Sequence, residues 1–256
     1  MKKLLLILLC LPIIGFGQFN FKTYVPDDNF ETYLEINGMG DGIQLNDSIN
    51  TLSIEMLMYL DVSNQNISDL TGIEDFTVLT SLNCSENNLT TLDVSNNIYL
   101  TELVCYGNQL TILDVSNNFT LTDLFCGSNQ LTILDVTQNP NLLLLGCNYN
   151  PLISLDLRNG NNTSLSGLWC LGNSNLYCIN VDDSVWSTAN WTVANQNIDP
   201  QHYFSNNCSP SAIQEHTTNK ELLKVTDLLG RETKQTNQPL FYIYDDGTVE
   251  KRIVIE

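Results

Sequence analysis

The chain has 256 residues and a formal net charge of −19 at pH 7, from 29 acidic and 10 basic residues. Most of the imbalance lies in residues 18–210, where the only basic residues are Lys22 and Arg158. So acidic a surface repels phosphate backbones, which excludes nucleic acid as an expected partner and, for the same reason, disfavours uronic-acid polymers. The length is sufficient for a real hydrophobic core.

Residues 1–17 have the composition of a secretory leader. Two lysines precede the apolar run LLLILLCLPIIGFG, and a small residue, Gly17, comes directly before Gln18. This order predicts a signal peptide that is cleaved after Gly17. The apolar run is too short for a comfortable transmembrane span, and no later stretch is apolar enough to provide one. The chain is therefore expected to be exported without a transmembrane segment.

Residues 18–56 are predicted to form an N-terminal cap. In the segment PDDNFETYL, Asp27 or Asp28 suits the N-cap position of a short helix. Apolar side chains then follow at helical spacing and are expected to cover the open end of a core; they are Phe30, Tyr33 and Leu34. The next segment, NGMGDGIQLND, is predicted to be a surface loop, because its oxygen-bearing residues do not have the spacing of an EF-hand; they are Asp41, Asn46 and Asp47.

Residues 57–176 repeat the phrase LxLxxN. Its asparagines follow at alternating steps of 10 and 11 residues, so that one unit has 21 residues and two similar halves; they are Asn87, Asn97, Asn108, Asn118, Asn129, Asn139 and Asn150. The alternation in LxL is typical of a strand with one buried face, and a fixed period predicts a solenoid. Two strands per unit leave no room for a helix of ordinary length, so the coils are expected to be mostly β.

Stacking of such coils places like residues above like. One buried column is predicted for Leu82, Leu103, Leu124 and Leu145, and another for Cys84, Cys105, Cys126, Cys147 and Cys170. Strands about 4.8 Å apart keep parallel cysteines outside the usual Cβ separation of a disulfide, so these cysteines are predicted to stay reduced. Each corner asparagine is expected to bond the backbone of the neighbouring loop through its side-chain amide.

The phrase LxxLxCxxNxLTxLDVSNN resembles the leucine-rich repeat, in particular the 21-residue bacterial variety in which both halves of the unit read LxLxxN. The resemblance covers residues 57–176. It implies a mostly β solenoid with two short parallel strands per coil.

Residues 177–210 depart from the repeat and are predicted to close the solenoid. The segment is rich in bulky apolar residues, namely Trp186, Trp191, Tyr203 and Phe204, and it is bracketed by Cys178 and Cys208. A disulfide between these two cysteines is expected in an oxidising environment outside the cytoplasm. No metal site is predicted, because the chain has no CxxC spacing and only two histidines.

Residues 211–256 are less acidic, with eight acidic and six basic residues. Strands are predicted for LFYIY and KRIVIE, joined by a turn at Asp245, Asp246 and Gly247. The tail resembles the C-terminal sorting signal of the type IX secretion route of Gram-negative bacteria, which implies passage by the type IX machinery, removal of the tail, and release or surface attachment of the body. The residues that carry this resemblance are Lys224, Asp227, Gly230, Arg231, Asp246, Gly247, Lys251 and Arg252. The alternative is a plain C-terminal hairpin.

The repeats contain no catalytic motif and no cofactor motif. Their one polar column is Asp61, Asp93, Asp114, Asp135 and Asp156, each expected on the second strand of its coil. Stacked carboxylates repel, so their pKa values are predicted to rise unless cations collect there. The favoured interpretation is that each aspartate is a surface residue that bonds neighbouring Ser or Thr hydroxyls, because an enzyme needs two unlike carboxyl environments, which a repeat does not supply. The hypothesis of a glycan-active enzyme that uses this aspartate ladder is therefore kept as the alternative.

The outward position of the first strand varies from coil to coil and carries exposed aromatic residues. We expect a ligand-binding face formed by Val104, Tyr106, Phe125, Tyr149 and Trp169. Aromatic side chains on a rigid sheet are typical of recognition surfaces, although a loop that covers Phe125 and Trp169 would give the same pattern. The sequence thus predicts a non-enzymatic, exported module that binds an extracellular protein or glycan.

Overall fold

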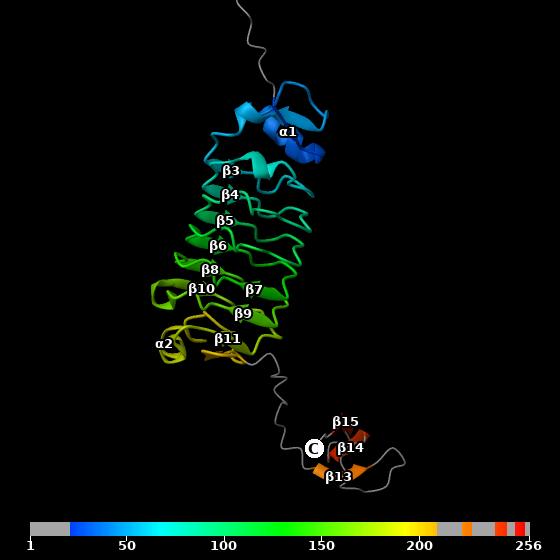
Figure 1. The fold of residues 1–256 in the computed structure, drawn as a ribbon, viewed down its shortest axis with the longest axis vertical. Coiled ribbons are helices and arrows are strands. Elements are labelled where there is room, and N and C mark those ends of the chain that lie inside the picture. Colours follow the sequence, from blue (N-terminus) through cyan, green and yellow to red (C-terminus); the bar gives the residue numbers. More distant parts are fainter. Residues whose placement is uncertain (1–20, 209–221, 227–238, 245–248, 254–256) are drawn as a thin grey trace, which may run out of the picture. The chain divides into compact units, whose positions relative to one another are not determined.

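In a computed structural model the chain forms two compact units, residues 1–208 and residues 209–256. The structure describes residues 21–208, 222–226, 239–244 and 249–253 (Figure 1). The predicted leader therefore lies outside the described residues, as do five positions of the predicted sorting signal, namely Asp227, Gly230, Arg231, Asp246 and Gly247. No helix in the described part of the chain combines the length and the apolar character needed to cross a bilayer.

The first unit is a solenoid whose coils stack along one axis (Figure 1). One strand of each coil joins a six-stranded parallel sheet in which equivalent residues of successive coils stand in register. Its strands, in spatial order, are β3 (Tyr59–Asp61), β4 (Ser81–Asn83), β5 (Glu102–Val104), β6 (Asp123–Phe125), β8 (Leu144–Gly146) and β10 (Gly167–Trp169). The predicted leucine-rich repeat solenoid is confirmed.

A second parallel sheet has four strands, namely β7 (Ile133–Asp135), β9 (Ser154–Asp156), β11 (Cys178–Asn180) and β12 (Tyr203–Ser205). The predicted second strand is thus present from Ile133 onward. In the two preceding coils the LDV segments are not strands. There the side-chain amides of Asn118 and Asn139 donate to the carbonyl oxygens of Val94 and Val115, at 3.1 and 3.0 Å, so side chains link the coils in place of a backbone ladder.

The placement of Asp61 on the second strand of its coil is wrong. Asp61 lies on β3, in register with Asn83 of the six-stranded sheet. The reason is the atypical first coil, in which the LDV phrase occupies the position that the first-strand phrase occupies in later coils.

The predicted columns of leucine and cysteine form the core. All residues of the leucine column are fully buried, namely Leu82, Leu103, Leu124 and Leu145. All residues of the cysteine column are fully buried free thiols, namely Cys84, Cys105, Cys126, Cys147 and Cys170. Burial of one leucine side chain contributes roughly 1.5 to 3 kcal/mol to folding. Burial also raises the pKa of Cys84 and of Cys126 to about 12. These thiols are therefore protonated and have no nucleophilic role at neutral pH.

The corner asparagines are buried and bond the backbone of neighbouring coils, as predicted. Asn108 Oδ1 accepts from the N–H of Leu89 at 3.0 Å, while its Nδ2 donates to the carbonyl oxygens of Cys84 and Cys105 at 3.0 and 3.1 Å. Asn129 and Asn150 repeat this pattern one and two coils later. Since an unpaired buried backbone group is costly, these amides fix the spacing between coils.

The N-terminal end is closed by α1 (Asp28–Ile36) and by an antiparallel pair, β1 (Lys22–Tyr24) and β2 (Ser48–Asn50). Asp27 is the N-cap of α1, with its carboxylate accepting from the N–H groups of Asn29 and Phe30. Phe30 and Leu34 are fully buried, and Phe30 stacks on Phe76 of the first coil. Short 3-10 helices complete the coils: η1 (Thr51–Ser53), η2 (Ile73–Asp75) and η3 (Asn162–Ser164).

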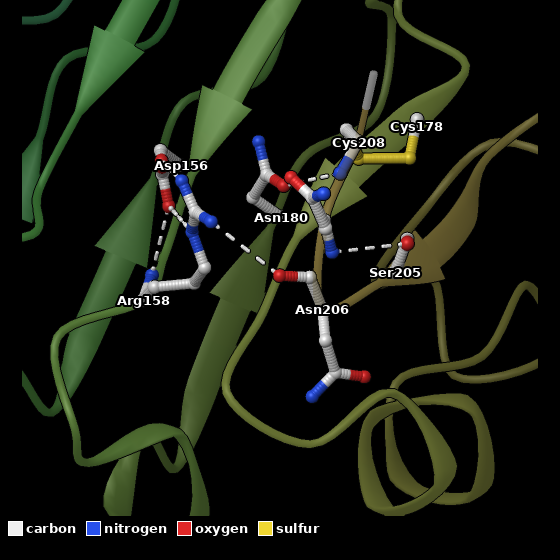
Figure 2. The surroundings of a disulfide bond; sticks show 8 residues. Asp156, Arg158, Cys178, Asn180, Ser205, Asn206 and Cys208 are labelled. Atoms are coloured by element: carbon white, nitrogen blue, oxygen red, sulfur yellow. Dashed lines mark hydrogen bonds and ion pairs between the residues drawn. A yellow bond between two sulfur atoms is a disulfide. The ribbon is translucent and has the colours of Figure 1, made fainter.

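The C-terminal end is closed by α2 (Ser184–Asn190), by buried Trp191, and by the predicted disulfide between Cys178 and Cys208, which the structure confirms. The disulfide joins the start of β11 to the residues after β12 (Figure 2). Trp186 and Phe204 pack against Trp191, with ring centroids 5.4 and 5.6 Å away.

The second unit contains a three-stranded antiparallel sheet of β13 (Leu222–Thr226), β14 (Pro239–Tyr244) and β15 (Val249–Ile253). The predicted pairing of the last two strands is confirmed. Lys224 lies on β13, and Lys251 and Arg252 lie on β15.

Candidate binding face

Three of the five residues predicted for the binding face form one row on the six-stranded sheet. Val104, Phe125 and Trp169 occupy equivalent outward positions on β5, β6 and β10, and Gly146 of β8 lies between the last two. Trp169 is 42% exposed, so it is not covered by a loop, whereas Phe125 is half-buried. Tyr106 and Tyr149, also exposed, lie outside the strands, shortly after β5 and β8.

The two aromatic rings of this row pack over glycines. A Cβ atom on Gly146 would lie 2.9 Å from Cδ1 of Phe125, so that ring lies over the space where a side chain is missing. The ring centroids of Phe125 and Trp169 are 6.2 Å apart, with 34° between their planes. A Cβ atom on Gly167 would meet both the Trp169 ring and Cδ2 of Leu144, at 2.6 and 2.8 Å. Phe125, Leu144 and Trp169, called the aromatic platform below, thus form one apolar surface.

Tyr149 occupies the corner that follows the sheet, with a left-handed φ of 56°. The equivalent residue of each coil is also left-handed; these residues are Asn64, Glu86, Gly107, Ser128, Tyr149 and Gly172. The N–H of each of the first five donates to a carbonyl of the next coil. A bulky residue is uncommon in this conformation. The Tyr149 ring packs on Gly172 of the next coil, where a Cβ atom would lie 2.5 Å from its Cδ1. A strained aromatic residue where the fold accepts glycine supports a functional role.

Carboxylates flank the aromatic platform. Glu102, Asp123 and Leu144 form the adjacent outward column, in register on β5, β6 and β8. Both carboxylates accept hydrogen bonds from hydroxyls: Ser81 Oγ donates to Glu102 Oε2 at 2.7 Å, and Thr122 Oγ1 donates to Asp123 Oδ2 at 2.9 Å. The face therefore combines apolar rings with two negative charges.

The aspartate ladder does not titrate as predicted. The expected rise in pKa is wrong for Asp93 and Asp114, because the hydroxyl and backbone N–H groups of Ser95 and Ser116 hold the pKa of these carboxyls below the usual range. The charge of Asp114 raises the pKa of Asp93, but this effect is smaller than that of the hydrogen bonds.

Asp61 also has a lowered pKa. Burial raises the pKa of its carboxyl, but hydrogen bonds from Ser63 and Asn83 together outweigh that effect. Since Asp61, Asp93 and Asp114 all favour the ionised form, none of the three is suited to donate a proton at neutral pH.

A hollow of about 690 Å³ opens beside Asp93 and Asp114. Its polar lining consists mainly of carboxylates and hydroxyls and includes Glu74, Thr90, Thr91 and Thr111. The two ladder carboxylates in it have equivalent surroundings and the same direction of pKa shift. Acid and base catalysis by a carboxylate pair requires unlike environments, so the arrangement is suited to polar contacts rather than to bond cleavage.

One carboxylate cluster was not predicted from the sequence. Single carboxylate oxygens of Asp28, Glu31 and Asp47 all lie within 4.8 Å of one another. Oxygen donors of this kind suit a hard cation. However, Glu31 is fully buried and its carboxylate already accepts from the N–H groups of Asn46 and Asp47, at 2.9 and 3.1 Å. These bonds show that Glu31 anchors the loop after α1, and the sequence spacing gave no signal for that contact.

No family model matches the chain. A stretch of 78 residues, 30% of the chain, is 42% identical to Internalin J of Listeria monocytogenes serotype 4b (strain F2365) and spans 8% of that protein. The solved functional domain of InlJ from Listeria monocytogenes, which includes a cysteine ladder, is 38% identical with a TM-score of 0.53, over 63% of this chain and 38% of the InlJ chain.

A solved internalin (inlF) of Listeria monocytogenes strain 4b F2365 is 22% identical with a TM-score of 0.50, over 71% of this chain and 56% of the other, and shows the fold alone. The chain thus spans less than half of the solved InlJ domain and a small part of Internalin J. The buried cysteine column of this chain has a counterpart in the cysteine ladder of the InlJ domain. The chain has the fold of a bacterial leucine-rich repeat protein.

Proposed function

We propose that the chain is an exported, non-enzymatic binding module that holds an extracellular protein or glycan on the outward face of its six-stranded sheet. The observation that carries this proposal is the aromatic platform, in which Phe125 and Trp169 lie on glycines of a rigid sheet, with Trp169 exposed and Phe125 half-buried. Aromatic anchors held in this way lose little conformational entropy when a partner binds.

Two further observations support binding over catalysis. The ladder carboxylates that the hollow contains have alike surroundings and lowered pKa values. The chain is also similar in fold to the functional domain of InlJ. Export is supported by the leader and by the resemblance of the tail to a type IX sorting signal, which would place the module at the surface of a Gram-negative cell or in its medium.

The test of this function is a pair of aromatic variants. The purified chain is screened on a glycan array and on a panel of surface proteins, and the ligand it captures is titrated against Phe125→Ala and Trp169→Ala. Each variant is expected to weaken binding by more than about 1 kcal/mol, as aromatic anchors do, with an unchanged thermal midpoint. Phe119→Ala is the control, because Phe119 is an exposed aromatic residue that lies outside the six-stranded sheet.

Two outcomes would contradict the proposal. Equal binding by both variants, with sharply lowered thermal midpoints, would show that the two rings are core residues. The second outcome is turnover of a captured glycan. If Asp93→Asn and Asp114→Asn abolish this turnover and the aromatic variants retain it, the chain is a glycan-active enzyme.

A further inference from the structure

The aromatic platform and its two carboxylates lie within reach of a single ligand side chain. Asp123 precedes Phe125 by two residues on β6, so both side chains project from the same face about 6 to 7 Å apart along the strand. Glu102 stands next to Asp123 in the same column, one strand away. Leu144 continues this column on β8, and its Cδ2 atom and the Trp169 ring border the same space above Gly167.

These carboxylates have no basic partner on the solenoid. Within residues 21–208 the only lysine and arginine are Lys22 and Arg158. Lys22 pairs with Asp41 in the N-terminal cap, and Arg158 pairs with Asp156 on the other sheet (Figure 2). Among the described residues, Glu102 and Asp123 accept hydrogen bonds from the hydroxyls of Ser81 and Thr122, which leave their charge uncompensated.

We infer that the partner is a protein that presents an arginine-bearing, basic segment to this face, with a guanidinium stacked on Trp169 and Phe125 and paired with Glu102 and Asp123. This inference rests on the proposed binding face and adds the chemistry of its partner. A guanidinium is planar and weakly hydrated, and it can stack on an aromatic ring while its N–H groups bond a carboxylate. A neutral sugar would use the rings but would leave the two carboxylates without a counterion.

Arginine is favoured over lysine by the same geometry. The Phe125 and Trp169 rings are inclined by 34° and form a nearly continuous surface, which suits a flat group better than a compact ammonium. An acidic partner is disfavoured by repulsion from Glu102 and Asp123 and from the chain as a whole, whose net charge is −19.

The experiment uses the full chain and a synthetic peptide of repeated Arg-Gly-Ser units, together with counterparts in which lysine or glutamate replaces every arginine. The arginine peptide is expected to bind more tightly than the lysine peptide, the glutamate peptide is expected not to bind, and added salt should weaken binding. Glu102→Gln combined with Asp123→Asn should weaken binding of the arginine peptide by about fivefold or more. Trp169→Ala should do the same, and Trp169→Phe, which keeps a ring, should restore part of the loss.

The matched control is Asp114→Asn combined with Asp135→Asn. It removes the same charge from the other side of the solenoid and should change binding by less than about twofold. Equal losses from the two double variants would show attraction by net charge alone, and the inference would be wrong.

The remaining outcomes separate this inference from the proposed function. Failure to bind the arginine peptide, together with Trp169-dependent binding of a neutral glycan on the array, would overturn the basic partner and leave the binding face standing. A second outcome is that the chain captures a ligand and that Trp169→Ala, with an unchanged thermal midpoint, binds this ligand equally well. That outcome would overturn both the basic partner and the proposed binding face.

Discussion

At the scale of single residues, the buried histidine of the C-terminal cap has a defined protonation state. His202 Nδ1 accepts from the N–H of Asp199 at 3.2 Å, which requires that this nitrogen carry no proton. Its Nε2 then faces the carbonyl oxygen of Asn173 at 3.4 Å as a donor. Burial lowers the pKa of His202 and outweighs the opposing effects of the Asn173 carbonyl and the Asp199 charge.

This state predicts an acid-sensitive cap. The pKa of His202 is lower in the folded than in the unfolded chain. Neutral His202 therefore contributes to the free energy of unfolding above the unfolded-state pKa of about 6.5. This contribution is lost as the pH falls through the folded-state pKa. The urea midpoint should therefore be lower at about pH 5.5 than at about pH 7.5. The lowered pKa values of Asp41, Asp61, Asp93 and Asp114 act only at more acidic pH and do not enter this interval.

The control for this prediction is the other histidine of the chain, His216. His202→Asn should remove the pH dependence of the midpoint, whereas His216→Asn should retain it. A wild-type midpoint that does not change between the two pH values would contradict the assignment.

The candidate site shows which residues a sequence can and cannot identify. Phe125 and Trp169 were predictable, because their positions in a fixed period place them on the outward side of the sheet. The glycines that seat them were not, since the contact of Phe125 with Gly146 depends on the rotamer of the ring and not on the repeat. Nor did the spacing of the ladder aspartates reveal their lowered pKa values, which depend on hydrogen bonds from Ser95 and Ser116.

At the scale of secondary-structure elements, periodicity predicted the first sheet better than the second. A 21-residue period fixes which residues stack, and so it predicted the columns of leucine, cysteine and asparagine. It does not fix whether stacked segments bond through their backbones. The coils around Val94 and Val115 connect through asparagine side chains, whereas Val136 donates its backbone N–H to the carbonyl oxygen of Asp156 at 3.1 Å.

The disulfide of the C-terminal cap gives the prediction at this scale. It ties β11 to the segment after β12, where Cys208 N–H also donates to Asn180 Oδ1 at 2.6 Å (Figure 2). A bridge across a separation of 30 residues stabilises the folded chain by about 3 to 4 kcal/mol in the chain-entropy model. Cys178→Ser combined with Cys208→Ser should lower the free energy of unfolding by that amount in a urea titration.

Thiol labelling supplies the control. In denatured, unreduced protein that lacks residues 1–17, the five ladder cysteines should react, and Cys178 and Cys208 should not. The double serine variant should give the same five thiols. Two reactive thiols or fewer in the wild type would show that the ladder is oxidised, against the stacking argument.

At the scale of the whole molecule, the two compact units differ in charge and in architecture. The solenoid unit has its own core and both of its caps, and it contains nearly all of the acidic excess. The second unit is a small antiparallel sheet with almost balanced charge. A unit that is compact by itself suits a removable address, which is the role we propose for it.

The last prediction tests that role in the native host. Deletion of residues 221–256 should leave the thermal midpoint of the solenoid unchanged, because each unit is compact by itself, and should strand the protein in the periplasm. Lys251→Ala combined with Arg252→Ala, within β15, should reproduce the export defect. Lys220→Ala combined with Lys234→Ala removes the same charge from the tail outside the recognised motif and should leave export intact.

If the truncated chain still reaches the cell surface or the medium, the tail is a plain hairpin. Export would then depend on the leader and the solenoid alone.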